Sequence, residues 1–203
     1  MLHSLPSELL RSLRLVLVIA VVTGLVYPLA MTGLAQGLFH NQAQGSLVTR
    51  NGQVVGSKLI GQEFTSDRYF HGRPSATVSA TTGKPQPYAA GNSAGSNLGP
   101  SNKALIDRVS KDVQTVRKQD GLGKNQQVPA DMVTTDFSGF DPDISEASAL
   151  LQVNRVAHAR HLDASKVRTL VGHHVQGRIL GIFGEPHVNV LDLNMALDSG
   201  GGA

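Results

Sequence analysis

One uninterrupted apolar segment limits what this chain can fold into more than any other feature. No charged side chain occurs between Leu15 and Phe39. As a helix, a segment of this length would measure roughly 37 Å. That is enough to cross a hydrocarbon layer of about 30 Å with some tilt. We therefore expect a membrane-spanning helix over residues 15–39, preceded by a short cytoplasmic segment over residues 1–14.

Basic residues on one side of this span indicate its orientation. Arg11 and Arg14 precede it, offset only by Glu8, and the next Lys or Arg is Arg50. Because Lys and Arg resist translocation, the N-terminus is predicted to lie in the cytoplasm and the remainder outside. A cleaved signal peptide is the alternative interpretation. A retained anchor is favoured over it because the apolar region of such a signal is only about 7–15 residues long.

The span also contains residues suited to contact with other membrane helices. Pro28 removes one backbone hydrogen bond, so a neighbouring group is expected to satisfy the freed carbonyl. Gly24 and Gly33 offer places where a second helix can approach closely. These three residues are therefore candidate contacts with a membrane partner.

After the span, the sequence changes to a mixture of strand and helix patterns. Asn51-Gly52 between apolar residues predicts a β-hairpin over 48–55. The stretch 72–102 is poor in large apolar residues and is expected to be a long loop or linker. The apolar periodicity and caps predict helices over about 100–121 and 145–160 and from Asp163 onward, a strand over 178–183, and a last element of unassigned type that begins at 188–191.

These elements predict an α+β fold, in which one N-terminal transmembrane helix is followed by a single mixed α/β extracytoplasmic domain. The domain is expected to cover residues 40–197. The glycine-rich end, residues 198–203, is expected to be a disordered tail.

The composition excludes several classes of function. The chain has no Cys, so disulfides, thiolate metal sites and thiol catalysis are excluded. Its net charge is only +3, and no run of Lys and Arg is interleaved with aromatic residues, so nucleic acid is not expected as a partner. Neither a Gly-x-Ser-x-Gly nucleophile motif nor a Walker-type lysine loop occurs. No catalytic residues are predicted.

Two groups of side chains have the composition of metal ligands without the spacing. The histidines are His158, His161, His173, His174 and His187, and the carboxylates are Asp131, Asp136, Asp141 and Asp143. No HExxH motif accompanies the histidines, and the carboxylates lack a DxDxDG register. Surface histidines and turn carboxylates are therefore the favoured interpretation, and no metal site is predicted.

Six blocks of sequence carry a family resemblance. They are 69–76, 93–100, 128–134, 138–145, 152–157 and 184–191. In order and spacing they resemble the C subunit of the Kdp-type potassium-transporting ATPase, and the resemblance extends from Tyr27-Pro28 to about Leu197. Small departures are Phe140 before Asp-Pro and the glycine tail, and neither touches the block at 152–157.

The resemblance implies a non-catalytic accessory subunit in the bacterial inner membrane. Its partners would be a channel-like potassium-translocating subunit and a P-type subunit that hydrolyses ATP. The C subunit of this family is described as a catalytic chaperone that raises the affinity of the ATPase subunit for ATP. Potassium would be the transported ion and ATP a shared cofactor. A Gln-x-x-Arg element of the family has been connected with nucleotide binding, and Gln152 and Arg155 match it.

The predicted orientation conflicts with direct nucleotide contact, since it places Gln152 and Arg155 outside the cell, where ATP is scarce. The alternative is that the pair, three residues apart on one helix, holds the preceding loop. This structural role is favoured, and each alanine substitution is expected to cost about 1–2 kcal/mol. The competing functional class is a stand-alone membrane-anchored envelope enzyme or binding protein. A pilin-like subunit is disfavoured because no Glu lies within the span.

Overall fold

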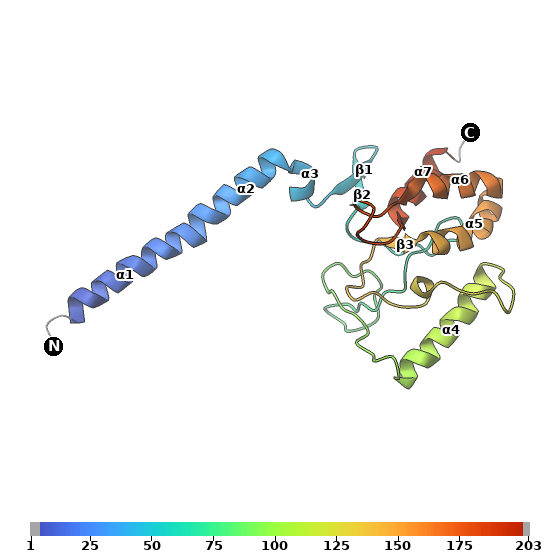
Figure 1. The fold of residues 1–203 in the computed structure, drawn as a ribbon, viewed down its shortest axis with the longest axis horizontal. Helices are drawn as coiled ribbons and strands as arrows, with labels where there is room; N and C mark the ends of the chain where they lie inside the picture. Colours follow the sequence, from blue (N-terminus) through green and yellow to red (C-terminus); the bar gives the residue numbers. More distant parts are fainter. Residues whose placement is uncertain (1–4, 201–203) are drawn as a thin grey trace. The chain divides into compact units, whose positions relative to one another are not determined.

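The computed structural model describes residues 5–200, which belong to two compact units. The first unit ends at Leu47 and the second begins at Val48. Figure 1 shows a long helical segment in the first unit and mixed helices, strands and loops in the second.

The first unit is dominated by consecutive helical elements. They are α1 (Leu5–Val21), the π-helix η2 (Val22–Val26) and α2 (Tyr27–Leu38), followed by the single-turn α3 (His40–Ala43). The stretch Pro6–Leu38 is long and apolar enough to cross a membrane, with a mean hydropathy of 2.3 in its most apolar window. The helical segment begins before the predicted span, since residues 5–14 are helical as well.

Pro28 is the second residue of α2, just after the π-helix η2. The amide of Tyr27 donates to the carbonyl of Val22, five residues back, in place of the usual four. A π-turn of this kind widens the helix locally, so the irregularity at Pro28 is accommodated within the chain's own helix. A Cβ built at Gly24 or Gly33 meets nothing within 4 Å, so both glycines leave open helix surface. A partner contact at these positions stays a prediction.

The second unit contains two small sheets and four longer helices. The elements from residue 47 onward are β1 (Leu47–Arg50), β2 (Gln53–Ser57), α4 (Lys103–Gln119), the 3-10 helix η3 (Ala130–Met132), β3 (Asp143–Ser145), α5 (Glu146–Arg160), α6 (Ala164–His174), β4 (Val175–Gln176), β5 (His187–Asn189) and α7 (Val190–Gly200). Strands β1 and β2 form the predicted hairpin, and Asn51 and Gly52 both have positive φ, as a type I′ turn requires. The α+β prediction is confirmed.

The main core lies where α5, α6 and α7 meet the three-stranded sheet. The strand order is β3-β5-β4, and Val188 in the central strand pairs with Ile144 on one side and Val175 on the other, both antiparallel. The largest fully buried apolar side chains of this core are Phe70, Ile144, Val153, Val156, Val167, Val171, Val188, Leu193 and Leu197.

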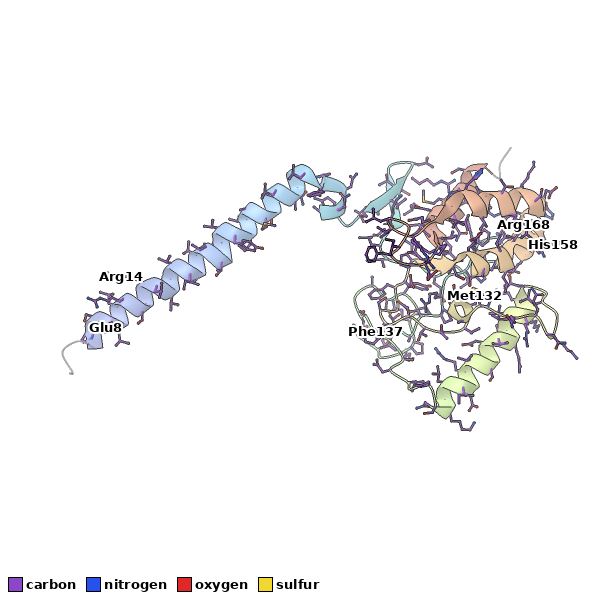
Figure 2. The ribbon with its side chains drawn as sticks, in the orientation of Figure 1. Glu8, Arg14, Met132, Phe137, His158 and Arg168 are labelled. Carbon is purple, nitrogen blue, oxygen red and sulfur yellow. The ribbon has the colours of Figure 1, made fainter. Side chains whose placement is uncertain are left out.

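A second, smaller core lies beside α4. Val116 of α4 packs with Met132 and Val133, and Leu151 of α5 joins them. Figure 2 shows Met132 between α4 and α5. This residue therefore links α4 to the helix that carries the Gln-x-x-Arg element.

Two helix starts follow the sequence closely. Ser145 caps α5 by accepting from the amide of Ser148, and Asp163 caps α6 by accepting from the amide of Ser165. Helix α4 begins at Lys103, slightly later than predicted, because the side chain of Asn102 is its N-cap.

The strand predicted over 178–183 is wrong. This segment is a tight turn between β4 and β5, and its apolar side chains are exposed. Gly181 and Gly184 have positive φ, a backbone conformation that interrupts an extended strand. The apolar run was mistaken for a buried strand although nothing in this unit covers it.

The glycine-rich end also differs from expectation. Helix α7 continues to Gly200, beyond the predicted start of the tail at residue 198. Asp198 is held in this helix because its carboxylate accepts hydrogen bonds from Arg50, Tyr69 and Arg160. Residues 201–203 lie outside the described part of the chain.

Candidate functional site

The candidate site is a segment without regular structure that is held by buried polar side chains. Backbone groups of residues 67–71 are paired with side chains from α5 and α7. We call Asp120, Gln152, Arg155 and Asn194 together the polar clamp. Each of the four residues is buried, with exposures of 8%, 0%, 8% and 2% respectively.

Gln152 pairs with the backbone of His71 through both ends of its amide. Its Oε1 accepts from the His71 amide at 2.8 Å, and its Nε2 donates to the His71 carbonyl at 3.1 Å. The same Oε1 accepts from Nη2 of Arg155 at 2.6 Å. The two residues of the Gln-x-x-Arg element are therefore bonded to each other, as their i, i+3 spacing on a helix permits.

Arg155 distributes its guanidinium donors over several buried acceptors. Nε donates to Oδ1 of Asp120 at 2.8 Å, in an ion pair whose side chains are 5% and 2% exposed. Nη1 donates to the carbonyls of Asp67 and Tyr69, both at 2.9 Å. Asp120 is the C-cap residue of α4, so one arginine joins α4, α5 and the segment 67–71.

Asn194 repeats the chemistry of Gln152 one residue earlier in the segment. Its Oδ1 accepts from the Phe70 amide at 2.8 Å and its Nδ2 donates to the Phe70 carbonyl at 2.9 Å. Two side-chain amides thus bond consecutive backbone units in the manner of a neighbouring β-strand. A segment that lacks a strand partner is in this way satisfied inside the protein.

The side chain of His71 lies against the clamp. Its Nε2 is 3.0 Å from the carbonyl of Ser66, and its Nδ1 is 3.3 Å from Nε2 of Gln119. A carbonyl only accepts, so Nε2 carries the proton and Nδ1 accepts from the amide of Gln119. Burial, and then the positive charge of Arg155, lower the pKa of His71, which favours this neutral form.

Asp120 experiences opposing effects. Burial raises the pKa of its carboxyl group, while the hydrogen bond and the charge of Arg155 lower it, and the net direction is upward. A buried carboxylate of this kind is kept in place by its arginine, because removing one member leaves the other charge uncompensated.

A cavity of about 430 Å³ adjoins the clamp without exposing it. Its lining includes His71, Gly72, Arg73, Tyr88, Gln119 and Met132. Neither Gln152 nor Arg155 lines this cavity. The pair that the family resemblance connects with nucleotide binding is therefore directed into the protein, toward the segment 67–71.

The stretch 72–102, expected to be a long loop or linker, is bound to the rest of the second unit by polar contacts. Ser75 Oγ donates to the carbonyl of Gly139 at 2.9 Å and accepts from the amide of Tyr88 at 3.0 Å. The carboxylate of Asp136 in turn accepts from the amide of Gly139 at 2.9 Å. Polar contacts here perform the function that apolar packing performs elsewhere, which is why composition alone suggested a linker.

The acidic residues of the calcium alternative have other partners. Asp131 accepts from the hydroxyls of Ser145 and Ser148 at 3.1 and 2.7 Å, and Asp141 pairs with Arg73 at 2.8 Å. Asp143 accepts from Asn189 at 3.0 Å. Within residues 5–200, no three His, Asp or Glu side chains come together in a metal-binding arrangement.

Three residues of this arrangement were missed from the sequence, namely Asp120 and Asn194 of the polar clamp and His71, whose backbone Gln152 holds. Asp120 was part of a helix end, Asn194 lay in an element whose type was left open, and His71 lay in one of the family blocks. Their partners are far away along the chain, so local patterns gave no signal. Only Asn194 gave an indication. It lies among apolar residues of α7, and a polar side chain on a buried helix face needs a hydrogen-bond partner.

Comparison of the sequence with known proteins identifies a family. Residues 9–199 match the family model described as KdpC, K+-transporting ATPase, c chain. The KdpC subunit of Rhodopseudomonas palustris (strain BisB18) is 54% identical over 198 residues, which are 95% of this chain and 98% of that protein. The KdpC subunit of Methylobacterium nodulans is 56% identical over 199 residues, covering 94% and 98%, and that of Bradyrhizobium diazoefficiens is 54% identical over 196 residues, covering 94% and 96%.

Proposed function

This chain belongs to the KdpC family of K+-transporting ATPase subunits, and from this premise we propose that it is a non-catalytic accessory subunit of an ATP-driven potassium uptake complex. The observation that carries the proposal is the match over nearly the whole chain, which includes the apolar helix Pro6–Leu38. In this proposal the chain is a single-pass protein of the bacterial inner membrane. Its N-terminus is cytoplasmic and its second unit lies outside.

The proposed partners are a channel-like subunit that translocates potassium and a P-type subunit that hydrolyses ATP. The chain would act as a catalytic chaperone that raises the affinity of the ATPase subunit for ATP. An effect of this kind requires only that the chain bind one conformation of its partner better than another. Direct contact with nucleotide is not required.

We further propose that Gln152 and Arg155 act by positioning the segment 67–71. The support is that the polar atoms of both side chains already have hydrogen-bond partners inside the protein. Both ends of the Gln152 amide are bonded to His71, and Nε and Nη1 of Arg155 are bonded to Asp120 and to two backbone carbonyls. Phosphate recognition by arginine uses the same donors, so the two roles exclude each other in this conformation.

The test compares complexes that contain or lack this chain. Cells that depend on the complex should fail to grow at low potassium when the chain is deleted, and growth should return when the chain is restored. A stand-alone envelope enzyme or binding protein would leave potassium uptake unchanged and would not co-purify with the ATPase subunits.

ATP titration separates the two roles of Gln152 and Arg155. Complexes carrying Gln152→Ala or Arg155→Ala should lose ATP affinity only in proportion to the loss of this subunit from the complex, measured as subunit ratio. If fully assembled and folded variants show a severalfold lower ATP affinity, the positioning role is wrong and the pair acts on nucleotide.

A further inference from the structure

The turn of the hairpin formed by β1 and β2 joins two residue types that react with each other in water. Asn51 is followed by Gly52, and both residues are exposed and have positive φ. The backbone nitrogen of a glycine can attack the side-chain amide carbon of a preceding asparagine, because glycine has no Cβ to hinder the approach. Asn51 is the one asparagine of this chain that precedes a glycine.

The reaction needs no reagent besides water. The Gly52 nitrogen gives up its proton and forms a bond to Cγ of Asn51, and the bond from Cγ to Nδ2 breaks, so that Nδ2 takes up a proton and leaves as ammonia. The product is a five-membered succinimide. Water then adds to either of its two carbonyl carbons and breaks the C–N bond there, which yields aspartate or isoaspartate. Nothing is oxidised or reduced.

The two reacting groups are free of hydrogen bonds in the part of the chain that the structure describes. Within residues 5–200, neither the Gly52 amide nor the Asn51 side chain has a hydrogen-bond partner. Other asparagine side chains are held by the fold. Nδ2 of Asn92 donates to a backbone carbonyl at 2.7 Å, and Oδ1 of Asn102 caps α4. Asn51 therefore combines the reactive neighbour with a free side chain.

The attack requires the hairpin to open, because a folded two-residue turn restricts the rotation that brings the Gly52 nitrogen to Cγ. Strands β1 and β2 form a two-stranded sheet of their own (Figure 1), and such a hairpin is marginally stable. Arg50, the last residue of β1, is bonded to α7: Nη1 donates to Oδ2 of Asp198 at 3.0 Å and Nη2 donates to its carbonyl at 3.3 Å. This ion pair, next to the reacting residue, opposes the opening.

We propose that Asn51 is a site of spontaneous deamidation, and that the ion pair between Arg50 and Asp198 slows the reaction by holding the hairpin closed. Isoaspartate lengthens the backbone path by one methylene group, so the two-residue turn no longer matches the register of its strands. The modification thereby loosens the end of β1 from which Arg50 reaches Asp198. This inference does not depend on the proposed function.

Ageing of the purified full chain in detergent tests the site. The chain is incubated at mildly alkaline pH, digested and analysed by mass spectrometry, and isoaspartate is detected by enzymatic methylation of its α-carboxylate. Position 51 should be converted from amide to acid severalfold faster than Asn125, which is also exposed but precedes Gln126. Asn51→Gln, whose longer side chain closes a ring much more slowly, should remove the modified species. Equal rates at Asn51 and Asn125 would overturn the assignment.

A substitution pair tests the role of the ion pair. Arg50→Gln should speed the modification of Asn51 severalfold, while Asn92, whose side chain is bonded in the folded chain, stays unmodified. Loss of the positive charge alone would slow the attack, because a nearby cation favours the deprotonated nitrogen, so faster modification reports on opening of the hairpin. Lys103→Gln breaks an exposed ion pair within α4 and should leave the rate at Asn51 unchanged. If Arg50→Gln leaves this rate unchanged or lowers it, the ion pair does not control the site.

Discussion

Replacing Gln152 by alanine measures what the polar clamp contributes to stability. The substitution removes the two hydrogen bonds to the backbone of His71 and the one from Arg155. It also removes two longer contacts of the amide nitrogen, to the Ser148 carbonyl and to the Met132 sulfur. Each such bond contributes about 1 kcal/mol net, and a buried donor or acceptor left unpaired costs about 1–3 kcal/mol. Gln152 is 0% exposed, so truncation also leaves a cavity. We expect a loss of about 3–4 kcal/mol, larger than the 1–2 kcal/mol expected from the sequence.

The assay is unfolding of the full chain in detergent by heat and by urea. For a chain of this length, a loss of this size should lower the melting temperature by roughly 6–16 °C. Asn154→Ala is the matched control, since Asn154 is an exposed residue on the same helix, and its effect should stay within about 0.5 kcal/mol.

Hydrogen exchange provides the local readout for the same variant. The amide of His71 should exchange much faster in Gln152→Ala than in the unmodified chain, because its acceptor is gone. The reasoning is refuted if Gln152→Ala is as stable as Asn154→Ala and the His71 amide keeps its protection.

Three further predictions test other parts of the chain. Burial and the charge of Arg155 lower the pKa of His71 below its ordinary value of 6.5. The stability that this shift contributes is present above pH 6.5 and is lost as the pH falls through the lower pKa of the folded state. The melting temperature of His71→Gln should therefore vary less with pH in this range than that of the unmodified chain. Gly139→Ala should lower the free energy of unfolding by about 2 kcal/mol or more, because Gly139 has φ +79° and its new Cβ would clash with Cγ2 of Thr77. Gly83 has φ +65° but open space around it, so Gly83→Ala should cost only about 1 kcal/mol in the same melting experiment. A reporter that is active only outside the cytoplasm should be active when fused after Leu197, and a mature N-terminus at Gln36 would contradict the retained anchor.

Local signals predicted the parts of the fold that depend on neighbouring residues. The caps at Ser145 and Asp163 and the Asn51-Gly52 turn each act within about four residues, so the sequence shows them directly. The apolar helix is equally local, because its composition alone distinguishes it. These elements account for the confirmed α+β class and for the apolar helix.

Long-range polar pairing was outside the reach of the same reasoning. Phe70 and Asn194 are 124 residues apart in the chain, and His71 and Gln152 are 81 apart. Neither pair belongs to a periodic sequence pattern from which the contact could be predicted. The stretch 72–102 was interpreted as a linker for a related reason. Its contacts are made by hydroxyls and backbone groups, so the sequence shows no apolar pattern there.

The apolar run over 178–183 shows the opposite failure. Apolar residues usually indicate burial, and the segment was therefore assigned to a strand. Its glycines place the backbone in a turn, and the side chains remain on the surface. An apolar sequence in a subunit of a larger complex can be directed toward a partner, which the chain's own periodicity does not distinguish from a core.

The geometry of Arg155 also limits how the Gln-x-x-Arg element can influence ATP. To meet a phosphate, the guanidinium would have to leave Asp120 and the carbonyls of Asp67 and Tyr69. An ion pair broken in this way leaves a buried carboxylate uncompensated, at a cost of about 3–5 kcal/mol. A bidentate phosphate contact would use these same donors, so it would replace bonds that Arg155 already makes. We propose that any influence of these residues on ATP handling passes through the shape of the segment 67–71.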